Sequence, residues 1–208
     1  LTYELVLVAN YHKGNIPLDR TPEIVQHMSA SDPTLTVVAK VKEGMMGWDM
    51  RSGLEAASGS TIAVIDGDGQ MPATDVIRVY RALKSGDFDM AKTYRVERED
   101  GPKRIFISRI YNFLLKLLFP MVRVMDANSK PKIFTREAYN KLHLTTDRWF
   151  VDAEIVIQAA HYNFKIAEIP TVFHINTRRV SFVKMSSIVG FIFDMIRYRI
   201  FWRPDNVK

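Results

Sequence analysis

The stretch from Ile62 to Pro72, IAVIDGDGQMP, decides the fold and the site that we predict for this chain. Its first four residues predict a short buried strand, because the run is apolar, rich in β-branched residues and followed by a glycine-containing turn. Asp66, Asp68 and Gln70 come next at alternate positions, separated by single glycines. Carboxylate and amide oxygens suit a hard cation such as Mg²⁺ or Mn²⁺. On spacing alone, an ordinary Asp/Gly turn explains these residues at least as well.

Strand-like and helix-like segments alternate at short spacing around this stretch. We expect strands at 3–9, 35–39, 62–65 and 88–92, and helices at 21–28, 46–57 and 72–83. This alternation predicts an α/β fold, a Rossmann-like α/β/α sandwich with a mostly parallel, mixed sheet. Ligands of such sheets bind beyond the carboxyl ends of the strands. Asp66 and Asp68 are therefore expected at the functional edge.

The second half of the chain has a different pattern. We expect a polar loop at 94–103, a helix at 104–119, a loop at 126–132, a helix at 150–161, strands on either side of Pro170, and a final helix at 181–202. The helix expected at 104–119 has a polar stripe along one face, made of Arg104, Ser108 and Asn112. That stripe fits an anion-binding face or the solvated edge of a core helix. The final helix has a broad apolar stripe, which fits a membrane interface, a core or an oligomer contact.

Composition narrows the class of protein. The chain has 208 residues, 47% of them hydrophobic, which is enough for one sizeable core. It contains no cysteine, so a disulfide framework and a thiolate zinc site are excluded. No run approaches the roughly 18 to 20 apolar residues of a membrane span, and residues 1–9 lack the pattern of a signal peptide.

The net charge of +6 is concentrated in two segments. Residues 103–136 contain eight basic residues and one acidic residue, and residues 182–208 contain five and two. Both segments are also rich in large apolar residues. This combination favours an anionic membrane surface or a lipid phosphate over a nucleic acid, although basic side chains that solvate ordinary helices would give the same count.

Several segments, taken together, resemble one known family. The stretch at 66–70 matches a D-x-D-x-Q metal motif, and EGMMGWDMRSGLEAASG at 43–59 resembles a glycine-containing helix start followed by GL-x-x-A-x-G. Residues 126–129 resemble the start of D-x-x-S-G-F-R, and Arg178 with Lys184 resembles R-x-x-G-x-S-K. From about residue 3 to residue 184 the chain is similar to family 2 glycosyltransferases of GT-A fold, specifically the branch of dolichyl- and polyprenyl-phosphate sugar synthases.

The resemblance implies roles for individual residues. The implied metal ligands are Asp66, Asp68 and Gln70. The implied contacts to the donor diphosphate are Asp66, Arg178 and Lys184. The implied contacts to an acceptor phosphate are Arg95, Arg104, Ser108 and Ser129. The candidates to orient the nucleophile or act as a base are Asp126, Asp152 and Glu154.

The chain also departs from the family pattern. Lys130-Pro131-Lys132 replaces Gly-Phe-Arg after Ser129, and Ser181 and Val183 replace the Gly and Ser before the final Lys184. The family's first strand with its P-x-Y-N-E motif is not found, and the strand at 3–9 aligns with the second strand. Asn10-Tyr11 stand where an Asp pair helps to hold the base. The absence of Q-x-x-R-W disfavours a processive polysaccharide synthase.

The predicted function is metal-dependent, inverting sugar transfer. We expect a GDP- or UDP-linked sugar donor, Mg²⁺ or Mn²⁺, and a polyprenyl or dolichyl phosphate acceptor at the cytoplasmic face of a membrane, with no nucleic acid partner. Residues 1–180 would form the catalytic domain, and residues 181–208 would form an amphipathic helix. The sequence is compatible with a homo-oligomer. The alternatives are transfer to a hydroxyl acceptor in polysaccharide or glycolipid assembly, a sugar-nucleotide nucleotidyltransferase, and a non-catalytic membrane-surface module.

Overall fold

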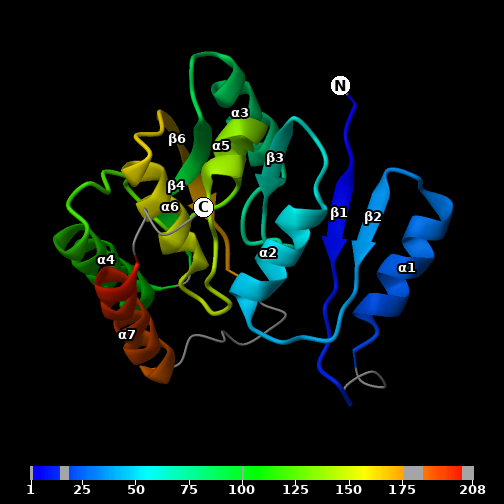
Figure 1. Cartoon of the computed structure of the whole chain (residues 1–208), viewed down its shortest axis with the longest axis horizontal. Helices are drawn as coiled ribbons and strands as arrows, with labels where there is room; N and C mark the ends of the chain where they lie inside the picture. The colour runs from blue at the N-terminus through cyan, green and yellow to red at the C-terminus, as the bar shows by residue number, and fades with distance from the viewer. Residues whose placement is uncertain (1, 15–18, 100, 176–184, 203–208) are drawn as a thin grey trace.

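Two β-sheets and the helices around them make up the part of the chain that the computed structural model describes, residues 2–14, 19–99, 101–175 and 185–202 (Figure 1). The strands are β1 (Leu5–Val8), β2 (Leu35–Val38), β3 (Thr61–Val64), β4 (Met90–Arg98), β5 (Lys132–Thr135) and β6 (Ile166–Phe173). The helices are α1 (Thr21–Ser31), α2 (Met46–Ala56), α3 (Thr74–Lys84), α4 (Pro102–Leu118), α5 (Arg136–Lys141), α6 (Val151–His161) and α7 (Met185–Phe201).

The larger sheet is mixed, with the strand order β3-β5-β4-β6. β5 runs antiparallel to both of its neighbours, and β4 and β6 are parallel. The predicted α/β class with a mixed sheet is confirmed. The central strand β5 was not predicted, because its four residues, KIFT, begin with a lysine that was assigned to the loop at 126–132 and leave only a very short apolar run.

The smaller sheet contains only β1 and β2, which pair in parallel. The described residues show no ladder between β1 and β3, so the single sheet expected from the alternation of strands and helices is wrong at this point. In the described part of the chain, β1 pairs only with β2, and β3 pairs only with β5. A cleft of about 2530 Å³ is lined by residues of β1 and β3, including Leu5, Leu7, Ile62 and Val64. Figure 1 shows β1 and β2 to one side of the larger sheet.

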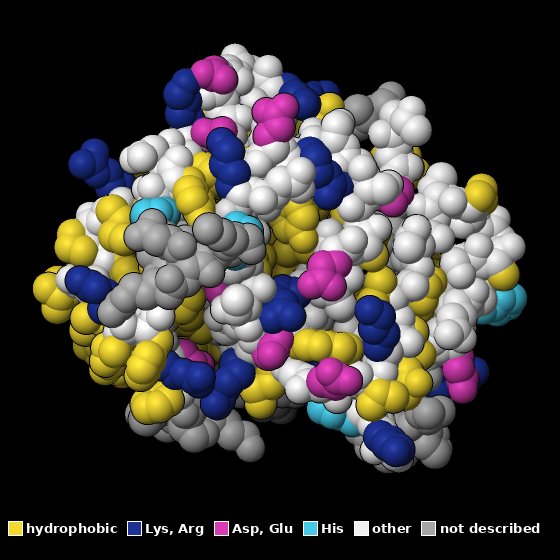
Figure 2. Space-filling view, in the orientation of Figure 1, with side chains coloured by type: hydrophobic (Ala, Val, Ile, Leu, Met, Phe, Trp, Pro, Cys, Tyr) yellow, Lys and Arg dark blue, Asp and Glu magenta, His cyan; other side chains and the backbone are white. Residues whose placement is uncertain are grey.

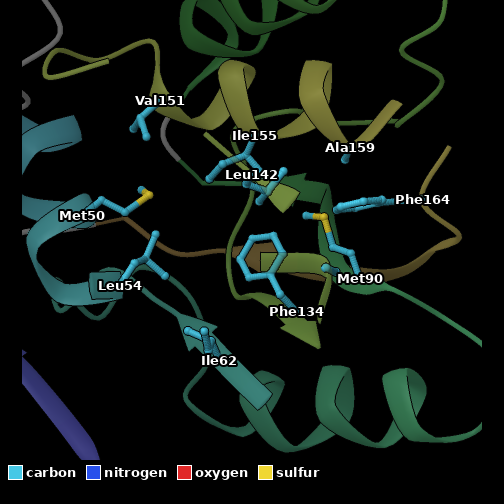
Figure 3. Close-up of a cluster of buried hydrophobic side chains, with 11 residues drawn as sticks. Met50, Leu54, Ile62, Met90, Phe134, Leu142, Val151, Ile155, Ala159 and Phe164 are labelled. Atoms are coloured by element: carbon cyan, nitrogen blue, oxygen red, sulfur yellow. The ribbon is translucent and has the colours of Figure 1, made fainter. Parts of the chain in front are cut away.

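Alternate residues of the larger sheet point into two different cores. Ile62, Met90 and Phe134 pack on one face against α2 and α6, as Figure 3 shows. Ala91 and Ile133 pack on the other face against α3. A further cluster joins α4, α6 and α7 and is made of Tyr111, Leu115, Phe119, Val122, Val124, Ala127, Phe150, Ala153, Val156, Ile157 and Met195.

Two predicted boundaries are wrong. The polar segment at 94–98 continues β4 instead of starting a loop, because it pairs with β6. β6 itself runs through Pro170 without a break. A proline is tolerated there because β6 is an edge strand, whose outer side has no ladder hydrogen bond to lose. The boundary predicted at residue 180 stays a prediction, although Met195 of α7 is fully buried in the core.

The start of α2 makes a close backbone contact that only glycine allows. The Gly47 amide donates to the Arg148 carbonyl over 2.8 Å. A Cβ atom at Gly47 would lie 2.2 Å from the Thr146 carbonyl oxygen and 2.5 Å from that of Arg148. These neighbours are backbone atoms, so they cannot turn aside as a flexible side chain would.

We therefore expect Gly47→Ala to lower the free energy of unfolding by about 1–3 kcal/mol, the range for overpacking a close contact. The measurement is urea denaturation followed by circular dichroism. Gly190→Ala in α7 is the matched control, because its nearest neighbour is a flexible Arg148 nitrogen at 3.9 Å. That variant should be unchanged or up to about 1 kcal/mol more stable. Equal stability of the two variants would contradict the contact.

Candidate active site

The loop after β3 carries the residues of the metal motif. Gly69 adopts a φ of 71°, and the Asp68 side chain accepts the Gln70 amide over 3.1 Å, which closes a tight turn. Gln70 then ties this turn to the end of β6. Its carbonyl accepts the His174 amide over 2.8 Å, and its Nε2 donates to the His174 carbonyl over 3.0 Å. The turn thus holds the three side chains at the carboxyl end of β3.

Lys130 extends from the loop before β5 to the first residue of the motif. Its ammonium lies 3.1 Å from Asp66 Oδ1 and 3.0 Å from Asp152 Oδ2. Asp152, in the first turn of α6, also pairs with Lys132. The Lys130 side chain is 2% exposed, whereas that of Asp66 is 44% exposed. A chain of ion pairs therefore runs from the interior of the protein to the metal motif.

The same cleft is lined by three of the predicted acceptor side chains, Arg95, Arg104 and Ser108. Arg95 of β4 donates to both carboxylate oxygens of Asp126, through Nε over 2.6 Å and through a terminal nitrogen over 2.8 Å. Its guanidinium also lies 5.3 Å from the centre of the Phe173 ring. The bidentate pair and the ring contact fix the plane of Arg95. Arg104 and Ser108 of α4 line the same cleft.

One cleft thus gathers six of the predicted site residues, which are Asp66, Asp68, Gln70, Arg95, Arg104 and Ser108. Ser129 lies behind its wall, fully buried, with its hydroxyl 2.7 Å from that of Thr93. Arg178 and Lys184 lie outside the described residues. The six residues that line the cleft come from the loop after β3, from β4 and from α4, so the fold brings together segments that are far apart in the sequence.

The three carboxylates that we considered as bases are all engaged within the fold. Burial raises the pKa of Asp126, but the hydrogen bonds and charge of Arg95 outweigh it and hold this pKa below its usual range. Burial likewise raises the pKa of Asp152, and the charges of Lys130 and Lys132 lower it further than burial raises it. Neither group has the pKa near neutrality that a general base needs.

Glu154 has a different environment. It is fully buried, and burial raises its pKa against the hydrogen bonds that it accepts from Thr145 and Thr146. Those bonds join α6 to the loop that carries Thr145 and Thr146. Glu154 is absent from the residues that line the cleft. Its described contacts are therefore those of a residue that anchors a loop.

Sequence reasoning missed the contacts of the buried side chains that hold the loops of the site in place. Lys92 is fully buried, donates to the Asp126 carbonyl and pairs with Glu168 over 3.3 Å. Asn112 was predicted in a polar stripe, and its Oδ1 accepts the Ala127 amide over 3.0 Å, which fixes the loop after α4. The signal for Lys92 was its place in the strand predicted at 88–92, because a charge that is buried in a strand needs a partner.

The oxygen donors at 66–70 fit a hard divalent ion. Mg²⁺ is commonly held by one or two carboxylates together with substrate phosphate oxygens, and Asp68 with Gln70 can supply protein oxygens of that kind. The described residues contain no group of three or more acidic, histidine or cysteine side chains arranged for a metal. The fit is therefore to an ion that a substrate helps to hold.

Comparisons with known proteins identify relatives of this chain. The model of the family described as glycosyl transferase family 2 matches residues 16–146. The glycosyltransferase AglD of Haloferax volcanii is 30% identical over 158 residues, which cover 73% of this chain and 25% of that protein. The dolichyl-phosphate beta-glucosyltransferase ALG5A of Trichomonas vaginalis is 26% identical over 220 residues, which cover all of this chain and 64% of that protein.

The fold has solved counterparts as well. A crystal structure of glucosyl-3-phosphoglycerate synthase from Mycobacterium tuberculosis, in complex with Mn²⁺, uridine diphosphate and glucosyl-3-phosphoglycerate, superposes with a TM-score of 0.67 at 15% identity. The match covers 94% of this chain and 68% of that one. It identifies the fold as GT-A-like. The family model covers well over half of the sequence, and so the chain belongs to glycosyl transferase family 2.

Proposed function

We propose that this chain carries the catalytic site of a metal-dependent, inverting glycosyltransferase that moves a sugar from a GDP- or UDP-linked donor to a polyprenyl or dolichyl phosphate. Membership of family 2 supports sugar transfer in general. The similarity to a dolichyl-phosphate beta-glucosyltransferase supports a lipid phosphate as the acceptor. The chain spans less than two thirds of the length of the curated relatives described above, so the activity proposed is that of the whole protein.

One observation carries this proposal. The carboxylates of the metal motif and the basic and hydroxyl groups of Arg95, Arg104 and Ser108 line the same cleft. A nucleotide sugar brings a diphosphate, and a lipid phosphate brings a second anion. The two sets of side chains suit those two anionic groups, one through a divalent ion and the other through direct charge and hydrogen bonds.

The reaction joins a phosphate oxygen of the acceptor to the anomeric carbon of the sugar. The bond from that carbon to the donor diphosphate breaks, and the electron pair leaves with the nucleoside diphosphate. Attack from the face opposite this leaving group inverts the configuration at the carbon. A divalent ion at Asp68 would stabilise the charge that builds on the leaving group. Arg95, held in one plane by Asp126, would orient the acceptor phosphate for attack.

The environment of the carboxylates favours a phosphate over a hydroxyl acceptor. A hydroxyl must lose a proton as it attacks and needs a general base. Asp126 and Asp152 are ion-paired with lowered pKa values, and Glu154 is buried away from the cleft. A phosphate is already largely ionised near neutral pH, so positioning by Arg95 and Arg104 is the main requirement.

An exposed apolar surface supports action beside a membrane. α4 presents Phe106, Ile110, Phe113 and Leu117, which are 42–66% exposed, on one face. α7 packs on α4 through Tyr111 and Phe191 and adds Phe193, Ile196, Ile200 and Phe201, which are 46–73% exposed. Figure 2 shows hydrophobic side chains gathered with basic ones over these helices. We call these eight apolar residues the α4/α7 surface.

Such a surface suits an anionic bilayer. The exposed basic residues Lys103, Arg109, Lys116, Arg197 and Arg199 lie on the same two helices. Apolar side chains that enter the acyl boundary and cations that meet lipid phosphates together describe an interfacial contact. Among the described residues, none of the helices has both the length and the apolar character needed to cross a bilayer.

The metal assignment predicts the effect of Asp68→Ala. The variant should transfer sugar at least about 10²-fold more slowly, because the charge on the leaving diphosphate loses its stabilisation. The measurement is transfer of labelled sugar from UDP- or GDP-sugars to polyprenyl phosphate with Mg²⁺ or Mn²⁺. Asp87→Ala is the control, because this carboxylate is 92% exposed and pairs with Lys165 outside the cleft. Near-normal turnover of Asp68→Ala would refute the metal site.

The membrane assignment predicts the effect of Phe106→Ser combined with Phe113→Ser. Because both rings are more than 60% exposed, the fold should persist while binding to vesicles is lost. The measurement is co-sedimentation with phosphatidylcholine vesicles that contain phosphatidylserine. Ile24→Ser is the control, since Ile24 is 53% exposed on α1, outside the α4/α7 surface. Equal sedimentation of the double variant and the unchanged protein would exclude this surface as the membrane contact.

A further inference from the structure

A bulge near the carboxyl end of β4 changes which of its side chains share a face. Arg95 pairs with Thr171 of β6, but the next residue of β6 pairs with Glu97, so β4 has one extra residue at this point. Side chains alternate between the two faces of a strand, and residues three apart therefore normally point to opposite faces. An extra residue shifts this alternation by one position. The bulge thus turns Arg98 to the same face of the sheet as Arg95.

The ring of Phe173, in β6, contacts both of these arginines. The guanidinium carbon of Arg98 lies 5.3 Å from the centre of the ring, and that of Arg95 lies 5.3 Å from it as well. A cation at this distance over an aromatic ring is attracted to it. One ring therefore keeps two guanidinium groups near each other. Arg95, Arg98 and Phe173 all line the cleft, together with Arg104.

The end of β6 also connects these arginines to the metal motif. The Phe173 carbonyl accepts the Glu99 amide over 3.0 Å. The next residue, His174, forms the two backbone hydrogen bonds with Gln70 that close the turn after β3 onto β6. The Glu99 carboxylate accepts the Ile175 amide over 3.0 Å. Three consecutive residues are therefore tied to β4 or to the metal turn, and the backbone that carries the Phe173 ring is held in place.

We propose that Arg98 is a further ligand of the acceptor phosphate, beside Arg95, and that Phe173 is the positioning residue that holds the two guanidinium groups for it. This inference rests on the proposed function, because it takes a polyprenyl phosphate as the acceptor. Two guanidinium groups on one phosphate would fix its orientation as well as its position. Such orientation is what attack in line with the leaving diphosphate requires.

Other contacts of the arginines are compatible with this role. A guanidinium carries five N–H donors, and a carboxylate that binds it in the bidentate manner occupies two of them. Arg95 makes such a pair with Asp126 through two of its nitrogens. Arg98 can likewise hold partners within the protein and bind a phosphate at the same time.

The test is equilibrium binding of farnesyl phosphate, a short polyprenyl phosphate, to the whole protein in detergent micelles, measured by isothermal titration calorimetry. Arg98→Gln removes the charge and keeps a polar side chain. We expect this variant to bind farnesyl phosphate at least about tenfold more weakly, the loss expected for a hydrogen bond to a charged group. Its binding of farnesol, which has the same hydrocarbon chain and no phosphate, should be unchanged. Arg20→Gln is the matched control and should bind both lipids normally, because Arg20 is 75% exposed and lies outside the cleft lining.

Two substitutions of Phe173 separate positioning from a purely structural role. Phe173→Tyr keeps an aromatic ring against both guanidinium groups, so the affinity for farnesyl phosphate should be unchanged. Phe173→Leu keeps an apolar side chain without the ring, and the affinity should fall at least about threefold. In the Phe173→Leu background, Arg98→Gln should cost less affinity than in the unchanged protein, because its guanidinium is no longer held in place. Thermal melting establishes that each variant is folded, and if Phe173→Leu does not fold, Arg98→Gln still decides.

The outcomes distinguish this inference from the proposed function. If the unchanged protein prefers farnesyl phosphate to farnesol and Arg98→Gln leaves both affinities unchanged, Arg98 has no such role and a lipid phosphate stays the proposed acceptor. Equal losses for the two lipids would also overturn the inference, because the phosphate would then play no part. If the unchanged protein binds the two lipids equally, the inference and the lipid phosphate acceptor are both wrong. A loss confined to farnesyl phosphate supports both.

Discussion

A layer of buried charge at the amino end of β5 and the adjacent part of β4 is the constraint on which the site depends. Lys92, Lys130 and Lys132 are each at most 2% exposed. A buried ammonium is strongly unfavourable unless it is paired and hydrogen-bonded, and removing one partner of such a pair costs about 3–5 kcal/mol. The layer must therefore form as a unit, and it joins β4, β5, β6 and α6 through Asp152, Glu168 and the carbonyls of the 126–130 loop.

This arrangement makes the electrostatics of the site a property of the core. α6 packs into two hydrophobic clusters, and that packing sets the position of Asp152. Asp152 sets the position of Lys130, and Lys130 meets Asp66 at the edge of the cleft. Charges that are held in this way need no reorganisation when a charged substrate arrives, which is the condition for effective stabilisation of a transition state. Lys132 shows the cost of the crowding, because burial and the neighbouring lysines lower its pKa to about 8.

The sequence predicted the parts of the fold and the site that depend on local patterns. The apolar run before Asp66 identified β3, and the position of Asp66 and Asp68 directly after that run placed them beyond the carboxyl end of the strand. β5 could not be predicted, because a strand of four residues that begins with a buried lysine is defined by its two neighbours in the sheet. The contacts of Lys130 could not be predicted for the same reason. The residue was visible as a departure from the family pattern, but its partners lie 22 and 64 positions away.

The helix α4 connects the two halves of the proposed function and limits how the protein can lie on a membrane. Arg104 and Ser108 line the cleft, while Phe106, Phe113 and Leu117 are exposed and lie outside the cleft lining. The exposed apolar stripe runs from 106 to 117, which is about 16 Å along the helix axis. If this whole stripe enters the acyl boundary, the axis must lie parallel to the bilayer surface. The side chains of Arg104 and Ser108 are then held near the level of the lipid headgroups, where a polyprenyl phosphate can present its phosphate while its hydrocarbon chain stays in the membrane.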